Sequence, residues 1–220
     1  MIVLGIVGAP ASGKSTVAAA LEKLGATWVN ADLVAREVLG RSNIQAELIA
    51  HFGDRIAGAD GSIVRARLAS VVFGDDDSSR AALKFLESVI HPPTRIEITR
   101  RLRQIDSDTR TDHNPRVAIL DVPLLFESHW DQSCDEVWYV DSAWETRLKR
   151  ARGRGWDAAE LQKRESNQLS IAEKRRRSQR VIKNDGGLDD LNDQIARYWH
   201  DLTQSAGNLE TDSHCRRKND

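Results

Sequence analysis

The chain has 220 residues, a length typical of one α/β domain, and its formal net charge is only −1. With 40% hydrophobic and 30% charged residues, the composition excludes an intrinsically disordered chain and favours a soluble globular fold. Cys134 and Cys215 lie far apart in the sequence, which excludes a disulfide framework and favours the reducing cytoplasm. The first apolar run is too short for a signal peptide, and no segment approaches the roughly 20 apolar residues that span a bilayer.

Five short apolar runs predict the strands of one sheet. Several of them are continuously apolar, as expected of strands that are buried on both faces. Helical segments separate the runs, so the fold class is predicted to be α/β, with a parallel five-stranded sheet covered by helices on both faces. The expected strands are residues 2–7, 27–29, 116–122, 136–140 and 180–183.

The remaining periodic segments predict helices. Pro92 and Pro93 are expected to interrupt one helix and to begin the next. Residues 1–204 are expected to form a single domain, followed by a disordered polar tail at 205–220. The expected helices are residues 14–24, 33–39, 43–52, 67–73, 79–90, 93–105 and 188–202.

The segment GAPASGKS at residues 8–15 fits the Walker A pattern G-x-x-x-x-G-K-[ST] between a strand and a helix. In such a loop, backbone N–H groups and the helix N-terminus bind phosphate oxygens. Lys14 is expected to reach the β- and γ-phosphates, and the Ser15 hydroxyl to bind Mg²⁺. The alternative is a glycine turn that happens to carry a lysine. The loop residues expected to bind ATP are Gly8, Ala11, Ser12, Gly13, Lys14, Ser15 and Thr16.

A carboxylate, Asp32, follows the second predicted strand. Because ligands bind at the carboxyl ends of parallel strands, we expect Asp32 and the phosphate loop to be neighbours. In phosphoryl transfer such a carboxylate orients the attacking hydroxyl and accepts its proton. The alternative is that Asp32 only caps the helix at 33–39, although Ala35 leaves no capping box there.

The segment at residues 147–180 is strongly basic. It contains twelve Lys or Arg and four Asp or Glu, a net charge of +8. Arg150 and Arg154 would share one face if the helix persists, and both are expected to close over ATP, with Arg150 stabilising the transferring phosphoryl group. A solvated helix face and an RNA-binding patch are the alternatives. Aromatic side chains are sparse there beyond Trp156, which disfavours RNA.

These features favour a small-molecule kinase, since an acid, a basic lid and a phosphate loop are all present. GTPases are disfavoured because no [NT]KxD motif occurs in the chain. Two other classes of function stay open: a P-loop kinase for a nucleoside or small alcohol, and a non-enzymatic nucleotide-binding regulator that holds RNA.

Eight segments carry a resemblance that runs from residue 2 to about residue 200: GIVGAPASGKSTVA, NADLVAREV, DGSIVRARLASVVF, VIHPPTR, LDVPLLFE, VDSAWETRLKRARGR, R-x-x-x-Q at residues 164–168, and VIKNDG. In the order and spacing of these segments, the chain resembles the dephospho-CoA kinase family. The resemblance implies a P-loop NTPase-type fold, with a helical acceptor-binding region at about 33–110 and a basic helical lid at about 147–180. It implies transfer of the γ-phosphate of ATP, with Mg²⁺, to the ribose 3′-hydroxyl of dephospho-CoA. The enzyme is expected to be a cytoplasmic monomer without nucleic acid or membrane partners.

The resemblance also implies an acceptor site. Asp32 matches the family's proposed base. His91 and Arg95 match its HPxxR motif, and Arg95 is expected to pair with the acceptor's pyrophosphate. His91 has the alternative of capping the preceding helix. Arg65 matches another family position, where a structural salt bridge is an equal alternative.

Four further residues gain roles from the same resemblance. Leu124 reads as a wall of the acceptor pocket, with ordinary core packing as the alternative, and Glu127 as a polar anchor in that pocket. Asp121 is expected to contact Mg²⁺ through water, as a Walker B acid does. Asn184 is expected to approach the adenine of ATP by its backbone, although Asn-Asp-Gly is also a common turn.

The chain departs from the family at three positions. Asn30 stands where the family usually has an acid, which suggests either that this position is supportive rather than essential or that acceptor binding is subtly changed. Ala9 and Ala11 replace two glycines of the phosphate loop. The Walker pattern tolerates both replacements, so ATP binding is expected to survive them.

Overall fold

The computed structural model describes residues 1–74, 76–108 and 115–216, with side chains up to residue 204. The chain divides into two compact units. The first unit combines Met1–Asn30 with Leu102–Asp220, and the second unit is Ala31–Arg101. The single domain expected at 1–204 and its helical acceptor-binding region at about 33–110 stay predictions.

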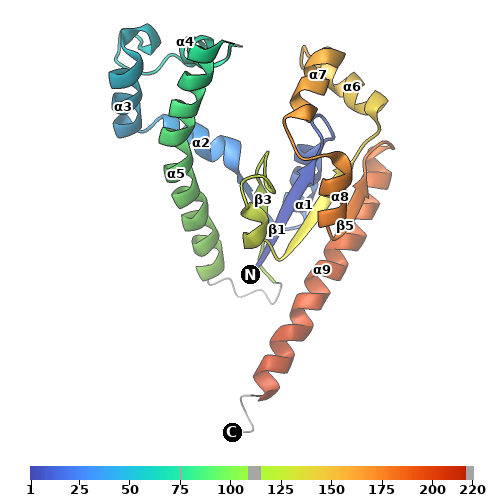
Figure 1. Ribbon diagram of the computed structural model, residues 1–220. Coiled ribbons are helices and arrows are strands. Elements are labelled where there is room, and N and C mark those ends of the chain that lie inside the picture. Colours follow the sequence, from blue (N-terminus) through green and yellow to red (C-terminus); the bar gives the residue numbers. More distant parts are fainter. Residues whose placement is uncertain (75, 109–114, 217–220) are drawn as a thin grey trace. The chain divides into compact units, whose positions relative to one another are not determined.

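The first unit contains the predicted parallel sheet of five strands (Figure 1). Its strand order is β2-β3-β1-β4-β5, and every neighbouring pair is parallel. We expected the phosphate loop and the end of β2 to be neighbours. They are not on adjacent strands, because β3 lies between β1 and β2. The strands are β1 (Ile2–Gly8), β2 (Thr27–Asn30), β3 (Val117–Asp121), β4 (Glu136–Asp141) and β5 (Arg180–Lys183).

Helices cover both faces of this sheet. On one face, α1 and α9 bury their apolar stripes against the side chains of the strands, where Trp138 is fully buried. On the opposite face, α8 contacts β1 and β4. Burial of apolar surface on both faces explains why the strands read as continuous apolar runs. The helices are α1 (Lys14–Lys23), α6 (Trp144–Arg152), α7 (Ala158–Ser166), α8 (Ile171–Arg177) and α9 (Leu188–Arg216), with a short 3₁₀ helix η2 (Trp130–Ser133).

The C-terminal helix is longer than expected. The structure continues α9 to Arg216, beyond the helix end predicted at residue 202 and into the tail expected at 205–220 (Figure 1). Leu191, Ile195 and Leu202 form its buried stripe against the sheet. Residues 217–220 of the predicted tail lie outside the described part of the chain.

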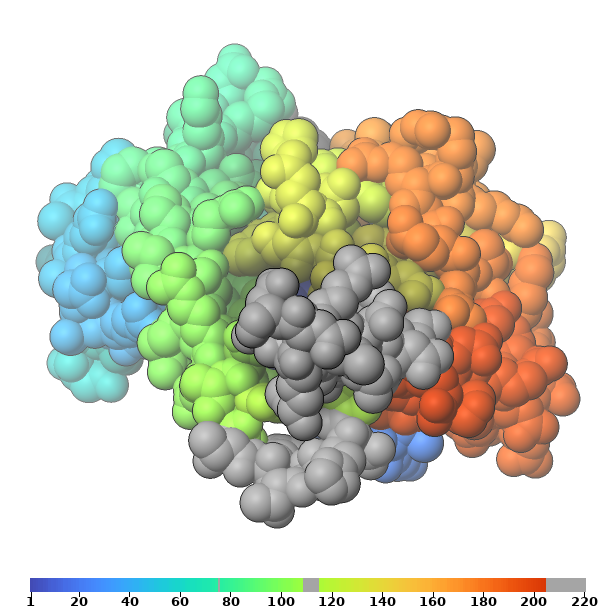
Figure 2. All heavy atoms as spheres, turned by 90° about the horizontal axis from the view of Figure 1, so that it is seen from below, coloured from blue at the N-terminus to red at the C-terminus, as the bar shows by residue number. Residues whose placement is uncertain are grey.

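The second unit is helical, and its side chains pack into one body in Figure 2, coloured blue to green. Its core includes Val34, Leu48 and Ile56, all fully buried. Its elements are α2 (Ala31–Leu39), α3 (Ser42–Phe52), the 3₁₀ helix η1 (Asp54–Ile56), α4 (Arg65–Val72) and α5 (Asp77–Ser107), whose last residues enter the first unit.

The predicted break at Pro92 and Pro93 is wrong, because α5 runs through both prolines. Each proline removes one intrahelical hydrogen bond and normally bends or ends a helix. Here the buried face continues across them at four-residue spacing, which favours one uninterrupted helix. The residues of this face are Ile90, Thr94, Ile98 and Leu102.

Candidate active site

The carboxyl edge of the sheet gathers the polar residues of the first unit. The phosphate loop follows β1, Asp121 ends β3, and Asn30 ends β2. Asn30 lies opposite Asp121 in the register, and its amide donates to the Asp121 carboxylate at 3.4 Å. The Asn30 departure thus places an amide donor, rather than a second acid, beside Asp121.

The phosphate loop needs unusual backbone geometry at two positions. Gly13 has φ 92° and Ala11 has φ 61°, both in the left-handed region. For Ala11 this conformation costs roughly 1–2 kcal/mol, which a glycine would avoid. Its methyl group is buried against Ala151 and Leu161, and this packing offsets part of the cost.

Gly8 is fixed as glycine by close packing. A Cβ atom at this position would lie 2.5 Å from the Ser12 hydroxyl and 2.8 Å from the Val140 carbonyl oxygen. Ser12 itself is buried, so its hydroxyl cannot swing out to make room. The loop is therefore held tightly against the end of β4.

A polar cluster, which we call the loop anchor, holds the phosphate loop in place through three buried residues and the half-buried Arg150. Its members are Ser12, Ser142, Arg150 and Asn184. The Ser12 carbonyl oxygen accepts from the Ser142 hydroxyl at 3.0 Å, from Arg150 at 3.0 Å and from the Asn184 amide at 2.8 Å. Ser142 and Asn184 follow β4 and β5, so the anchor ties three strand ends together.

Arg150 uses most of its donors within the loop anchor. One terminal nitrogen donates to Ser12 and to the Ser142 hydroxyl, and the other donates to the carbonyl and side-chain oxygens of Asn184. Only its Nε–H makes no hydrogen bond within the described residues. Arg150 therefore positions the phosphate loop, and its contact with a phosphoryl group stays a prediction.

Asn184 also meets the loop through its side chain. The residue is buried, and its amide nitrogen would lie 2.2 Å from a Cβ atom at Gly13. Its side chain is thus committed to the loop. The expected backbone approach of Asn184 to adenine stays a prediction.

Lys14 donates to the Gly8 carbonyl oxygen across the loop at 3.5 Å. Lys174 on α8, which the sequence analysis missed, is near enough to interact with Lys14 electrostatically. Lys174 is buried and donates to Gln168. Burial lowers its pKa, the Glu127 carboxylate acts in the opposite direction, and the charge of Lys14 lowers the pKa further.

Glu127 connects this region to the turn between α7 and α8. One of its carboxylate oxygens accepts from the Leu169 backbone N–H at 2.7 Å. Its other oxygen is buried without a hydrogen bond within the described residues. Neighbouring Leu124 is 41% exposed, so ordinary core packing is not its role, whereas the adjacent Leu125 is buried in the core.

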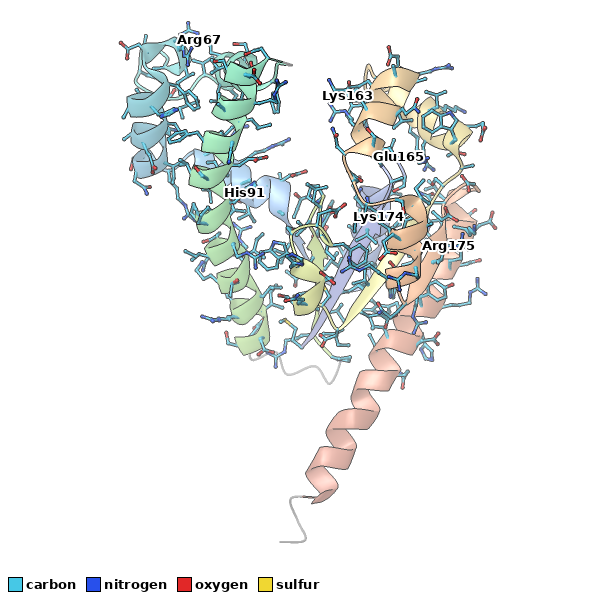
Figure 3. All side chains as sticks on the ribbon, viewed as in Figure 1. Arg67, His91, Lys163, Glu165, Lys174 and Arg175 are labelled. Carbon is cyan, nitrogen blue, oxygen red and sulfur yellow. The ribbon has the colours of Figure 1, made fainter. Side chains whose placement is uncertain are left out.

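The basic segment forms three short helices, α6, α7 and α8, which Figure 3 shows with Glu165, Lys174 and Arg175 labelled. Arg150 and Arg154 do not share one helix face, because α6 ends at Arg152 before a turn containing Gly153 and Gly155. Arg154 instead places its guanidinium over the Trp156 ring, 5.6 Å from the centroid.

Asp32 belongs to the second unit. It is the second residue of α2 and is exposed, so it is not the residue that caps the helix. Its carboxylate makes no hydrogen bond or ion pair within the described part of the chain. The capping alternative is therefore wrong, because the helix begins two residues earlier than predicted.

His91, Arg95 and Arg65 belong to the same unit. His91 and Arg95 lie one turn apart on α5 and are exposed, with His91 labelled in Figure 3. Since His91 lies inside α5, its alternative role as a helix cap is wrong. Arg65 begins α4 and forms no ion pair with the described residues, so the salt-bridge alternative has no support.

Other kinds of site find little support. Among the residues that the structure describes, no three His, Cys, Asp or Glu side chains gather as a metal cage. Burial raises the pKa of the Cys134 thiol to about 12, and Asp131 and Asp135 act in the same direction, so this thiol is a poor nucleophile. None of the described helices has the length and apolar content to cross a bilayer.

A glycine-rich phosphate loop anchored at the carboxyl edge of a parallel sheet defines a P-loop nucleotide-binding protein. The sequence matches the family model "Dephospho-CoA kinase" over residues 2–190. A dephospho-CoA kinase from Rhodopirellula baltica is 42% identical over 86% of this chain and 85% of its own, and one from Symbiobacterium thermophilum is 38% identical over 90% and 80%. A crystal structure of a Thermus thermophilus protein superposes with a TM-score of 0.73 and 33% identity, over 92% of this chain and 98% of its own. The chain belongs to the dephospho-CoA kinase family.

Proposed function

We propose that this protein transfers the γ-phosphate of ATP to the ribose 3′-hydroxyl of dephospho-CoA, which yields CoA and ADP. The observation that carries the proposal is the anchored phosphate loop in a chain that matches the family over residues 2–190. The Ser12 carbonyl oxygen of the loop accepts three hydrogen bonds, and this fixed backbone keeps the loop N–H groups directed at one position. Preorganised donors of this kind stabilise the charge of a transferring phosphoryl group.

In this mechanism, the two reacting groups are held by different residues. The loop N–H groups and Lys14 hold the β- and γ-phosphates of ATP. Asp32 orients the acceptor hydroxyl and accepts its proton as the bond to phosphorus forms. Arg154 neutralises phosphate charge, and Arg150 and Asn184 keep the loop in place.

Four further residues are proposed to bind the acceptor. Arg95 pairs with the pyrophosphate of dephospho-CoA through two parallel hydrogen bonds. Arg65 supplies a second positive charge, and Leu124 a partly exposed apolar contact. Glu127 serves as a polar anchor, since one of its oxygens is buried without a hydrogen bond in the described residues.

The residues present fit a Mg²⁺ ion. The Ser15 hydroxyl on the first turn of α1 and the Asp121 carboxylate at the end of β3 are hard oxygen donors at the same sheet edge. Mg²⁺ commonly takes one or two protein ligands and completes its shell with water and substrate phosphates. Bound there, the ion would neutralise the charge that develops on the transferred phosphoryl group.

The enzyme is further proposed to work as a cytoplasmic monomer without a nucleic acid partner. The basic lid would then serve ATP and not RNA. A gel-shift titration with RNA across a salt series tests this point, because binding through phosphates weakens steeply as salt rises. A tight, salt-dependent RNA complex would contradict it.

A coupled assay of ADP release tests the proposed function. With ATP and Mg²⁺, ADP should form when dephospho-CoA is added and not when a panel of nucleosides and small alcohols is added. ADP release with a nucleoside and none with dephospho-CoA would contradict the proposal and favour another P-loop kinase.

A further inference from the structure

The second unit contains a groove of about 210 Å³ between α2 and α5. This volume is below the roughly 300–1,000 Å³ typical of pockets that hold a whole ligand, so it suits one ring system of a larger molecule. Its floor is apolar and partly buried. The floor residues are Ala35 and Leu39 from α2 and Leu86 and Ile90 from α5.

The groove lies along the same face of α2 as Asp32. Residues separated by three, four and seven positions share one face of a helix, so Asp32, Ala35 and Leu39 line up. One turn of helix separates Asp32 from Arg36, roughly 6 Å along the axis. A nucleoside whose hydroxyl contacts Asp32 could therefore reach the groove with its base.

We propose that this groove binds the adenine base of the acceptor nucleotide, next to the ribose whose 3′-hydroxyl Asp32 orients. The inference rests on the proposed function. It adds a base-binding subsite formed by α2 and α5.

The rim of the groove carries the groups that a purine needs. Arg36 and His91 present planar cations or rings that stack on an aromatic base, and the Glu87 carboxylate accepts from an exocyclic amino group. All three side chains are exposed, and none makes a hydrogen bond or ion pair within the described residues. They are therefore available at the edge of an apolar floor.

Distance favours the base over the pantetheine arm as the occupant. In a nucleoside, the 3′-oxygen and the base are on the order of 5 Å apart, given ordinary bond lengths. This matches the single helical turn between Asp32 and the start of the groove. The pantetheine arm begins beyond the pyrophosphate, on the far side of the ribose.

The test fills the groove and measures two fragments of the acceptor. Ala35→Leu adds bulk to the floor from α2. At saturating ATP, we expect it to raise the KM for dephospho-CoA and the inhibition constant of adenosine, competing against dephospho-CoA, by the same factor of at least tenfold. The inhibition constant of pantetheine and the KM for ATP should not change.

Two further variants support the interpretation. Ala81→Leu makes the same change at an exposed position of α5 outside the groove and should leave every constant at the wild-type value. Arg36→Met removes the stacking guanidinium from an exposed site, so it should fold, and should raise the same two constants as Ala35→Leu.

The outcomes separate the subsite from the function. An unchanged KM for dephospho-CoA in both groove variants would overturn the subsite while leaving the kinase activity intact. A higher KM with an unchanged adenosine constant and a higher pantetheine constant would overturn it in favour of the arm. A wild-type enzyme that releases no ADP with dephospho-CoA would remove the proposed function, and the subsite with it.

Discussion

Gly13 has two separate reasons to be a glycine. Its φ of 92° lies in the left-handed region, and a Cβ atom would meet the Asn184 amide at 2.2 Å. The first reason costs roughly 1–2 kcal/mol in any other residue. The second would push Asn184 away from the Ser12 carbonyl oxygen and loosen the loop anchor.

These two effects can be measured apart. Gly13→Ala should weaken ATP binding at least tenfold, because the displaced anchor no longer holds the loop N–H groups in place. Gly25→Ala is the matched control, since Gly25 has φ 106° but no atom within 4 Å of its added Cβ. It should lose stability and keep its ATP affinity. Isothermal titration with ATP gives the affinity of each variant. Equal losses of ATP affinity in the two variants would argue against the role of the loop anchor.

The phosphate loop could be predicted from the sequence because its chemistry requires fixed residues at fixed spacing. Lys174 could not, since it lies in the run Lys174–Arg177 and nothing in that run distinguishes the buried side chain from its more exposed neighbours. Ser142 was overlooked although it lies two residues beyond the strand predicted at 136–140. The rule that ligands gather at carboxyl ends of strands would have pointed to it.

Glu97 on α5 pairs with the residue that precedes α3 and with two arginines of its own helix. Its buried carboxylate pairs with Arg41 at 3.1 Å, Arg100 at 2.7 Å and Arg101 at 3.1 Å. The hydrogen bond from Arg100 is the main cause that lowers the pKa of Glu97 from 4.5 to about 2, with burial opposing it and Arg101 assisting. The carboxylate therefore stabilises the folded state while it is ionised.

A pH series should expose this contribution. Because the folded pKa is depressed, the stabilisation is fully present above pH 4.5 and is lost as the pH falls towards 2. At neutral pH, Glu97→Gln should lower the free energy of unfolding by about 2 kcal/mol. The difference between wild type and variant should shrink as the pH falls through this window.

Denaturant titrations at several pH values provide the measurement. Glu47→Gln, at an exposed position of α3, is the control and should match the wild type throughout. A Glu97→Gln deficit that stays constant from pH 7 to acid would show that the ion pairs are not its source.

The extent of α5 shows a limit of local reasoning. Two prolines predict a break from backbone chemistry alone, whereas the buried stripe from Ile90 to Leu102 extends across them. Burial of that stripe is a property of the whole unit. Sequence patterns on either side indicate it only if the helix is assumed to continue.

The whole molecule has the predicted α/β fold class. Continuous apolar runs separated by helices leave few alternatives to a parallel sheet. The strand order was not predicted, since nothing in the runs shows that β3 inserts between β1 and β2. The second compact unit begins at Ala31, immediately before Asp32. Asp32 and Lys14 therefore belong to different units of the chain.

This division makes the proposed roles separable by experiment. The residues proposed to bind ATP belong to the first unit, and the proposed base belongs to the second. A change at Asp32 should therefore alter the chemical step and spare the nucleotide. Lys14→Ala, by contrast, should damage both ATP binding and the rate, because its ammonium contacts the phosphates in the ground state and in the transition state.

The most direct test is the turnover of Asp32→Asn alongside its affinity for ATP. Asparagine keeps the size of the side chain but cannot accept the proton, so kcat should fall roughly 100-fold or more while the Kd for ATP stays at the wild-type value. Asp54→Asn, an exposed acid of the same unit, should leave both values unchanged. An Asp32→Asn enzyme with the wild-type kcat would contradict the account.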